Sequence, residues 1–234
     1  MSSKGEQTRA RILDRALALA KAEGLEQITI GLLAEALAMS KSGVFAHFGS
    51  KEELQRAVLE EEEARFTAAV YRPALAAPRG LRRLQKLFEL WLNWGGCRCQ
   101  DCQCIPCTCA RCRGGCLMVA ASSEFDDKPG VIRDQLCELM QRLRAGLHRL
   151  IEEAVQLGEL NADTDPALLA FQMHALVLAV HHDLRLLGNA NAADFANRSF
   201  HALIRAAQAP SPAPVPGPRP GHAGAVAVST PTRP

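Results

Sequence analysis

The chain has little net charge, no long apolar run and no convincing β-strand. Its formal net charge is only +2 over 234 residues, which argues against a uniformly basic nucleic-acid coat and leaves any DNA contact to a local surface. No stretch approaches eighteen uninterrupted apolar residues, and the first residues, MSSKGEQTRAR, lack the apolar core of a signal peptide. We therefore expect a cytoplasmic protein without a membrane partner. The hydrophobic content of 48% is still sufficient for a folded core.

The sequence also lacks the motifs of common enzyme classes. It has no phosphate-binding glycine loop, no dinucleotide fingerprint and no nucleophile elbow. The carboxylates Glu124, Asp126 and Asp127 are clustered, but no nucleophile or matched base accompanies them. We therefore expect that the protein is not an enzyme and requires no cofactor.

The spacing of the apolar residues predicts an all-α fold that begins with short helices. An i, i+3, i+4 stripe over residues 9–23 predicts the first helix. Thr29 and Ser40 are suitable N-caps for two more helices, the second over residues 41–48, with a turn at residues 38–40 between them. Helices this short are marginal alone, so they must pack on one another.

Longer helices are predicted in the rest of the chain. Ser50, with Glu53 three residues later, has the capping-box pattern and starts the first of them. We interpret its acidic run at residues 60–63 as a solvent-exposed face and expect Pro73 and Pro78 to break the helix. Further helices are predicted over residues 80–94, 131–157, 167–187 and 192–207.

The last two predicted helices are apolar over more surface than one partner helix covers. A four-helix homodimer interface across a two-fold axis would bury this surface. The candidates for this interface are Leu168, Leu169, Leu176, Leu187, Phe195 and Leu203. The remaining residues, 210–234, are rich in Pro, Ala and Gly and are expected to be a disordered tail.

The two short helices over about 29–48 have the pattern of a helix-turn-helix, in which the second helix enters the DNA major groove. Residues 8–56 resemble the TetR family of bacterial transcriptional regulators. The matching sequences are TI at 29–30, LA at 33–34, SKSGVFAHF at 40–48 and SKEEL at 50–54. Ala38 departs from the family, which usually has glycine in this turn, and Phe45 stands where the family commonly has a phosphate-binding tyrosine.

The resemblance implies a domain organisation and a function. It implies an N-terminal three-helix DNA-binding domain over residues 1–56 and a helical ligand-binding and dimerisation domain over residues 57–209. It further implies a homodimer on a pseudo-palindromic double-stranded operator, acting as a repressor that a small-molecule or metal effector releases. Neither the operator nor the effector follows from the sequence.

The candidate DNA-binding residues surround the predicted recognition helix. A glycine at position 43 lets the helix approach the DNA closely, while Lys41 and Ser42 can meet phosphates or base edges near the helix N-terminus. His47 and Lys51 extend the phosphate-facing surface. The full set is Thr29, Lys41, Ser42, Gly43, Val44, Phe45, His47 and Lys51.

Eight of the nine cysteines lie between residues 97 and 116, mostly as Cys-x-Cys pairs. This spacing resembles a metallothionein-like thiolate cluster, and thiolates are good ligands for Zn, Cd and Cu(I). The candidate ligands are Cys97, Cys99, Cys102, Cys104, Cys107, Cys109, Cys112 and Cys116. The alternatives to a DNA-binding regulator are thus a metal-buffering protein or a metal-responsive repressor. A solvent-exposed insertion without function, an engineered insertion or a translated frame error would give the same pattern.

Several other residues that could bind a ligand or a proton are expected instead to pack in the core or at helix interfaces. His174 and His181 lie seven residues apart on one predicted helical face, beside His182, and are interpreted as neutral interface histidines. Large apolar side chains at helical spacing are usually core, with a ligand pocket as the alternative. The residues of this kind are Trp91, Trp94, Phe171 and Met173. Cys137 is expected to be buried.

Overall fold

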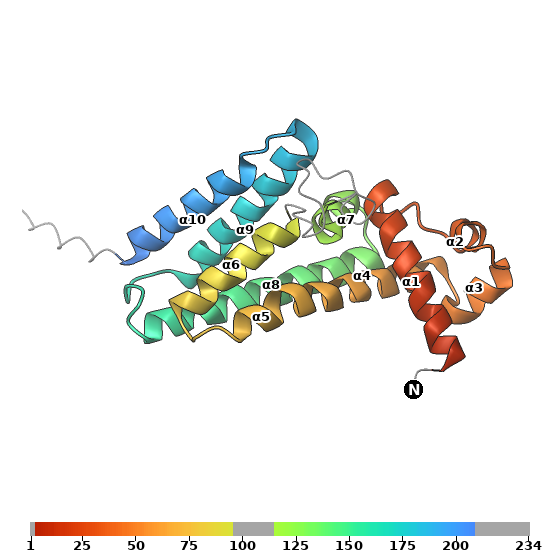
Figure 1. The fold of residues 1–234 in the computed structure, drawn as a ribbon, viewed down its shortest axis with the longest axis horizontal. Helices are drawn as coiled ribbons and strands as arrows, with labels where there is room; N and C mark the ends of the chain where they lie inside the picture. The colour runs from red at the N-terminus through yellow and green to blue at the C-terminus, as the bar shows by residue number, and fades with distance from the viewer. Residues whose placement is uncertain (1–2, 96–114, 209–234) are drawn as a thin grey trace, which may run out of the picture.

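The computed structural model describes residues 3–95 and 115–208, and every regular element within these ranges is a helix. The helices form an elongated molecule with α1, α2 and α3 at one end and a bundle that includes α5, α6, α8, α9 and α10 toward the other (Figure 1). The elements are α1 (Lys4–Glu23), α2 (Ile30–Ala36), α3 (Lys41–Phe48), α4 (Lys51–Phe66), a π-helical turn η1 (Thr67–Tyr71), α5 (Arg72–Leu75), α6 (Leu81–Gly95), α7 (Leu117–Phe125), α8 (Val131–Gln156), α9 (Pro166–His182), a second π-helical turn η2 (Asp183–Leu187) and α10 (Ala192–Gln208). The predicted all-α fold class is confirmed.

Side-chain caps fix the starts of the short N-terminal helices. The Thr29 hydroxyl accepts a hydrogen bond from the backbone N–H of residue 32 at 3.1 Å, and the Ser40 hydroxyl accepts one from residue 43 at 3.0 Å. The Ser50 hydroxyl does the same for α4. The predicted start of α1 was wrong by five residues, because Ser3 and Glu6 form a capping box that begins the helix at Lys4.

The turn between α2 and α3 contains Ala38 in an unusual backbone conformation. Its φ is +51°, and it is the one non-glycine residue in the described ranges with a positive φ. Alanine tolerates this left-handed conformation less well than glycine, so the surrounding helices must hold the turn.

The helix that begins at Lys51 does not break at Pro73. It continues through the π-helical turn η1 into α5, where Pro73 occupies one of the first helical positions. The wider π-helical turn directly before Pro73 accommodates the proline, which has no N–H to donate within the helix. The expected break therefore occurs only after Leu75, near Pro78.

The acidic run of α4 is not simply a solvent-exposed face. Glu62 is fully buried, with 0% of its surface exposed, and its carboxylate lies 2.8 Å from the ammonium group of Lys21 on α1. The same ammonium lies 5.2 Å from the centre of the Trp94 ring. A buried carboxylate needs such a partner, so this pair ties α1 to α4 and α6.

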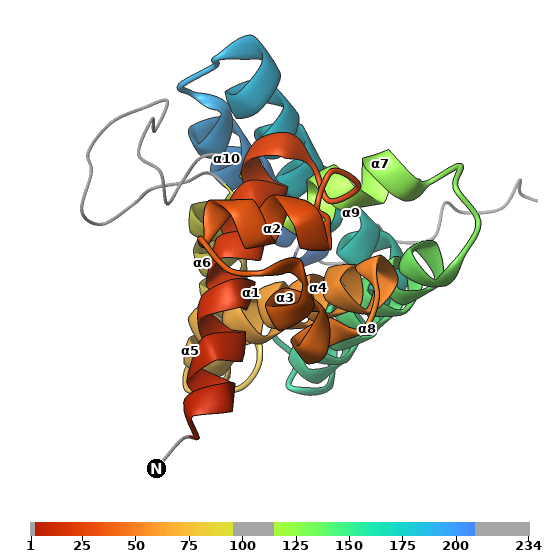
Figure 2. The same cartoon turned by 90° about the vertical axis from the view of Figure 1, so that its right-hand side faces the viewer.

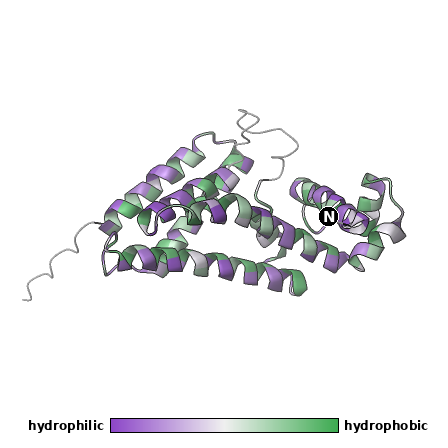
Figure 3. Cartoon of the chain, turned by 60° about the horizontal axis from the view of Figure 1, so that its bottom comes forward, coloured by the Kyte–Doolittle hydropathy of each residue, from purple (hydrophilic) through white to green (hydrophobic). Residues whose placement is uncertain are grey.

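The core consists of two clusters, and the first of them crosses the predicted domain boundary. It combines residues of α1–α4 with residues of α7 and the start of α8, including Leu117, Phe125 and Leu136. The second cluster joins α6, α8, α9 and α10, where the rings of Phe88 and Phe200 stack with centroids 4.1 Å apart. Apolar and polar residues alternate around these helices accordingly (Figure 3). Helix α7, which the sequence analysis did not predict, therefore packs directly against the N-terminal helices.

Helix α9 begins at the predicted signal, where the Asp165 carboxylate accepts hydrogen bonds from the backbone N–H groups of Ala167 and Leu168. With η2 it forms the one described helix, Pro166–Leu187, that is long and apolar enough to cross a membrane. This is weak evidence for a span, because core helices pass the same test, and α9 contributes six buried residues to the fold. Cys137 on α8 is exposed, so its predicted burial was wrong.

Gly146 allows α8 to pass close to the single tyrosine of the chain. A Cβ atom at Gly146 would lie 2.6 Å from the hydroxyl of Tyr71, which donates a hydrogen bond to the Leu143 carbonyl at 3.3 Å. We expect Gly146→Ala to lower the free energy of unfolding by about 1–2 kcal/mol, because the clash outweighs the better helix propensity of alanine.

Urea unfolding of a double-mutant cycle checks this expectation. Tyr71→Phe removes the clashing oxygen, so the double variant should recover at least half of the loss. Wild-type stability of Gly146→Ala alone would show that the close contact with Tyr71 does not constrain this position.

Candidate DNA-binding surface and ligand cavity

Helix α3 lies at the end of the molecule that faces the viewer in Figure 2. Lys41, Ser42 and Phe45 are exposed, and 55% of the Phe45 surface is accessible. Val44, a predicted DNA-contacting residue, is fully buried, so it holds the helix against the core. An exposed aromatic ring on a recognition helix is available for apolar contact with a base or sugar.

The remaining predicted DNA-contacting residues border this surface. Thr29 uses its hydroxyl as the cap of α2, while Lys51 is exposed at the start of α4 and His47 is half-buried at the end of α3. The Lys41 side chain passes over the first turn of α2, where a Cβ at Gly31 would lie 3.5 Å from its Cε. The predicted set thus lies around one end of the molecule, with Val44 beneath it.

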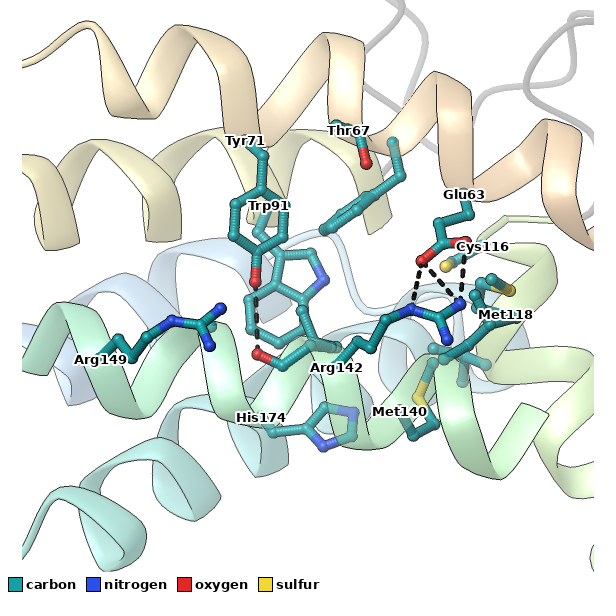
Figure 4. Close-up of a pocket in the computed structure, with 15 residues that line it drawn as sticks. Glu63, Thr67, Tyr71, Trp91, Cys116, Met118, Met140, Arg142, Arg149 and His174 are labelled. Carbon is teal, nitrogen blue, oxygen red and sulfur yellow. Dashed lines mark hydrogen bonds and ion pairs between the residues drawn. The ribbon is translucent and has the colours of Figure 1, made fainter. Parts of the chain in front are cut away.

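A cavity of about 220 Å³ lies in the larger part of the molecule, enclosed by α4, η1, α6, α7, α8 and α9 (Figure 4). Its lining residues are Glu63, Phe66, Thr67, Tyr71, Trp91, Cys116, Met118, Val119, Leu139, Met140, Arg142, Leu143, Gly146, Arg149 and His174. Most of these side chains are apolar or aromatic, as is usual for sites that bind small organic molecules.

The polar groups of the cavity are few. The Arg142 guanidinium donates two hydrogen bonds of 3.1 Å to the two oxygens of the Glu63 carboxylate. Burial raises the pKa of Tyr71 to about 12, so this hydroxyl stays protonated. Burial, and secondly the charge of Arg144, lowers the pKa of His174, so the imidazole is neutral at pH 7.

Two residues noted in the sequence meet at this cavity. The His174 imidazole stacks on the Trp91 ring with centroids 5.6 Å apart and an interplanar angle of 23°. Met173 is buried in the core as expected, whereas 57% of the Phe171 surface is exposed, so its predicted burial was wrong. His181 is half-buried beside Gly115, and burial followed by the charges of Arg185 and His182 lowers its pKa.

Cys116 lines the cavity at the N-cap of α7. Burial, and secondly the nearby Glu62 carboxylate, raises the pKa of its thiol. The other proposed metal ligands, Cys97, Cys99, Cys102, Cys104, Cys107, Cys109 and Cys112, lie outside the described residues. Within residues 3–95 and 115–208, no three His, Cys, Asp or Glu side chains are grouped to hold a metal ion.

Helix α7 connects the cavity to the N-terminal helices. Its first turn supplies Met118 and Val119 to the cavity wall. At its other end, the Glu124 carboxylate accepts hydrogen bonds from the backbone N–H groups of Leu25 at 2.8 Å and Glu26 at 2.9 Å. These residues form the loop between α1 and α2, so one carboxylate joins the cavity-lining helix to the end of the molecule that carries α2 and α3.

Other contacts reinforce this junction. Lys128, just beyond α7, forms an ion pair with Glu26. The Gln55 side chain of α4 is buried and donates a 2.8 Å hydrogen bond to the Leu25 carbonyl. The α1–α2 loop therefore has its backbone N–H and C=O groups bound by two different helices, α7 and α4.

Glu124→Gln is expected to loosen this junction. Glutamine offers one acceptor oxygen and one NH₂ group, so one of the two backbone N–H groups of Leu25 and Glu26 loses its partner. We expect a loss of about 1–2 kcal/mol in the free energy of unfolding. Amide hydrogen exchange should also become faster at these two residues.

Glu60→Gln provides the matched control, because Glu60 is an exposed residue of α4. It should leave both amides as protected as in the wild type. Unchanged exchange in Glu124→Gln would show that the carboxylate does not hold the loop.

Sequence reasoning missed most of the cavity, because its lining residues are spread from Glu63 to His174. The sequence analysis singled out Trp91 and His174, but it interpreted both as packing residues. Tyr71, Arg142 and Arg149 gave no local signal, since single residues on separate amphipathic helices converge only after folding.

Comparison with known proteins identifies the family. Residues 12–58 match the sequence profile of the bacterial regulatory proteins of the tetR family, and residues 80–200 match the tetracyclin repressor-like C-terminal domain. The second match spans more than half of the chain. A search of curated proteins gives no match.

Solved structures with the same fold are numerous. A TetR regulator from Chloroflexus aurantiacus is 20% identical, with 86% of this chain and 96% of that chain aligned at a TM-score of 0.73. A TetR-family regulator from Cytophaga hutchinsonii is 22% identical, with 88% and 98% aligned at a TM-score of 0.70. AibR, solved with isovaleryl coenzyme A and operator DNA, is 19% identical, with 82% and 96% aligned at a TM-score of 0.60. The chain belongs to the TetR family of bacterial DNA-binding transcriptional regulators.

Proposed function

We propose that the protein is a homodimeric repressor that leaves its operator when a small molecule occupies the cavity. The observation that carries this proposal is the path from the cavity through α7 to Glu124 and the α1–α2 loop. A ligand that needs a different position of α7 would bind better to one arrangement of the DNA-binding end than to the other. This differential affinity is what an effector requires. The AibR structure, which contains both an acyl coenzyme A and operator DNA, supports the proposal by analogy.

The proposed DNA contacts come from the exposed side chains around α3. Lys41 and Lys51 would meet phosphates, while Ser42 and Phe45 would face the major groove. Thr29 would act by capping α2, and Val44 by packing α3 against the core. Gly43 would let α3 approach the DNA closely, and His47 would extend the basic edge of this surface. A dimer would place two such helices in successive major grooves, about 34 Å apart.

The proposed dimer interface is the outward face of α9, of its continuation η2 and of α10. Six large apolar residues on it are at least 41% exposed: Leu168, Phe171, Leu178, Leu186, Leu187 and Phe195. Three of the predicted interface residues are less suitable: Leu169 is buried within the chain, while Leu176 and Leu203 are half-buried against the second core cluster. Single exposed apolar residues are common, but so many on two adjacent helices favour a second copy of the chain as their partner.

Selection of genomic fragments by the purified protein tests the proposed function. We expect enrichment of a fragment that carries an inverted repeat, followed by saturable binding to that duplex in fluorescence anisotropy. A duplex with one half-site scrambled is the matched control and should bind more weakly. Equal affinity for both duplexes at moderate salt would leave only non-specific binding and contradict the proposal.

We also propose, as a second function, that the cysteine-rich segment binds Zn, Cd or Cu(I) and makes the repressor metal-responsive. The position of Cys116 supports this proposal, because this residue belongs to the cysteine-rich segment and also lines the cavity. Its raised thiol pKa disfavours the thiolate that a metal needs, so we expect the seven cysteines from Cys97 to Cys112 to supply the first ligands.

Titration of reduced protein with Cd tests this second function. Thiolate-to-metal absorbance should appear and saturate at a small integer, and operator affinity should change at the same stoichiometry. Absorbance that never saturates, or saturates without any change in operator affinity, would exclude a regulatory role for the segment.

A further inference from the structure

The interior of the cavity suits an apolar ligand. Phe66 packs edge-on against Tyr71 and Trp91, with ring centroids 5.7 and 6.2 Å away. Met118 and Met140 complete the wall with flexible side chains that adapt to the shape of a ligand. An apolar ligand that fills this space removes its own apolar surface and that of these side chains from water.

The cavity lining contains more cationic than anionic side chains. Three lining residues carry a carboxylate or a guanidinium group, namely Glu63, Arg142 and Arg149. Glu63 and Arg142 satisfy each other through two parallel hydrogen bonds. The cavity therefore keeps one uncompensated positive charge, which belongs to Arg149.

Arg149 has no ion-pair partner among the residues that the structure describes. The carboxylate four residues further along α8, Glu153, is bound instead by Arg79 and Arg83. The Arg149 side chain extends toward Tyr71, the residue whose hydroxyl lines the cavity (Figure 4). Arg149 is exposed, so its guanidinium group lies at the mouth of the cavity.

We infer that the effector is a small organic anion, with its apolar body among the aromatic rings and its acidic group bound by Arg149. This inference rests on the proposed function, because it names the chemical class of the effector for that cavity. A cationic ligand would be repelled by the uncompensated positive charge of Arg149. A neutral ligand would leave this guanidinium group bound only to water. A planar carboxylate matches the fork of donors that a guanidinium group presents.

The size of the cavity limits the ligand. Its volume of about 220 Å³ lies somewhat below the range of roughly 300–1,000 Å³ that is usual for small-molecule sites. A body of one or two aromatic rings, or a short branched alkyl chain, fits this space. Larger anions would have to leave part of the molecule outside the mouth.

A matched pair of probes tests the inference. We propose calorimetric titration of the full chain with 2-naphthoate and with 2-naphthylmethanol, which share one aromatic body and differ in charge. The wild type should bind the carboxylate about 3–10 times more tightly, a modest factor because an exposed guanidinium is screened by solvent. In Arg149→Gln the two probes should bind with equal affinity.

Two further variants locate the binding. Arg82→Gln removes an exposed guanidinium from α6, outside the cavity lining, and should keep the wild-type preference. Met140→Trp fills part of the cavity and should weaken both probes at least about tenfold. The inference is overturned if the alcohol binds as tightly as the carboxylate, if the preference survives Arg149→Gln, if Met140→Trp binds both probes normally, or if neither probe binds to the wild type.

Operator binding without any probe separates this inference from the proposed function. A protein that binds its operator but does not prefer the carboxylate remains a regulator with a different effector class. If the protein prefers the carboxylate as described but binds no operator, the inferred class of ligand is supported and the repressor assignment is wrong.

Discussion

Replacing Gly43 with tryptophan is expected to reduce operator affinity at least about 100-fold, or ~2.7 kcal/mol. Gly43 lies in the first turn of α3, beside the exposed Lys41 and Ser42. An indole ring there would separate the recognition helix from the floor of the major groove. Fluorescence anisotropy with the operator duplex measures the loss.

Controls distinguish a lost DNA contact from a damaged helix. A Cβ at Gly43 would lie 3.1 Å from the Ser40 hydroxyl, so Gly43→Ala needs only a small adjustment and should keep most of the affinity. Ala64→Trp adds the same ring to the exposed face of α4 and should bind normally. Full operator affinity of Gly43→Trp, with wild-type circular dichroism, would exclude α3 as the recognition helix.

Lys41→Ala provides a milder test of the same surface. It should weaken binding about tenfold, ~1.4 kcal/mol, and should reduce the salt dependence by the equivalent of about one phosphate contact. Lys86→Ala, which removes a half-buried lysine of α6 that pairs with Glu89, should change neither quantity.

Leu178→Arg is expected to convert the dimer into monomers. Leu178 is 41% exposed on the outward face of α9, and a second copy of the chain would have to bury the new charge without a partner. Sedimentation velocity should show one species of monomer mass. Operator affinity should fall at least about 100-fold, since a monomer engages one half-site only.

Leu157→Arg is the matched control for the dimer. Leu157 is 54% exposed at the end of α8, outside the proposed interface. This variant should remain dimeric and bind the operator. A Leu178→Arg variant that stays dimeric would place the interface on another surface.

The sequence predicted those elements that depend on local chemistry. The N-caps Thr29, Ser40 and Ser50 each bind a backbone N–H three residues further along the chain. A short stretch of sequence is therefore sufficient to predict each helix start. The apolar stripes of the long helices are equally local, and their bounds were confirmed to within a few residues. The recognition helix was placed at its observed bounds, Lys41–Phe48, by the same signals.

The errors arose where distant residues decide the outcome. Glu62 looked solvent-exposed in an acidic run, yet it is buried because Lys21 of another helix neutralises it. Pro73 looked like a break because the π-helical turn before it has no sequence signature that we used. The junction of Glu124 with Leu25 and Glu26 joins residues almost one hundred positions apart, so only the folded chain reveals it.

Native mass spectrometry of the full chain with its operator duplex, in a buffer without chelator, tests the central claim most directly. A dimeric regulator predicts complexes in which two chains, or a multiple of two, bind one duplex, and a duplex with one scrambled half-site should lose them. The same spectrum reports any metal that the cysteine-rich segment retains. Complexes with a single chain per duplex, or no complex with DNA at all, would contradict the account.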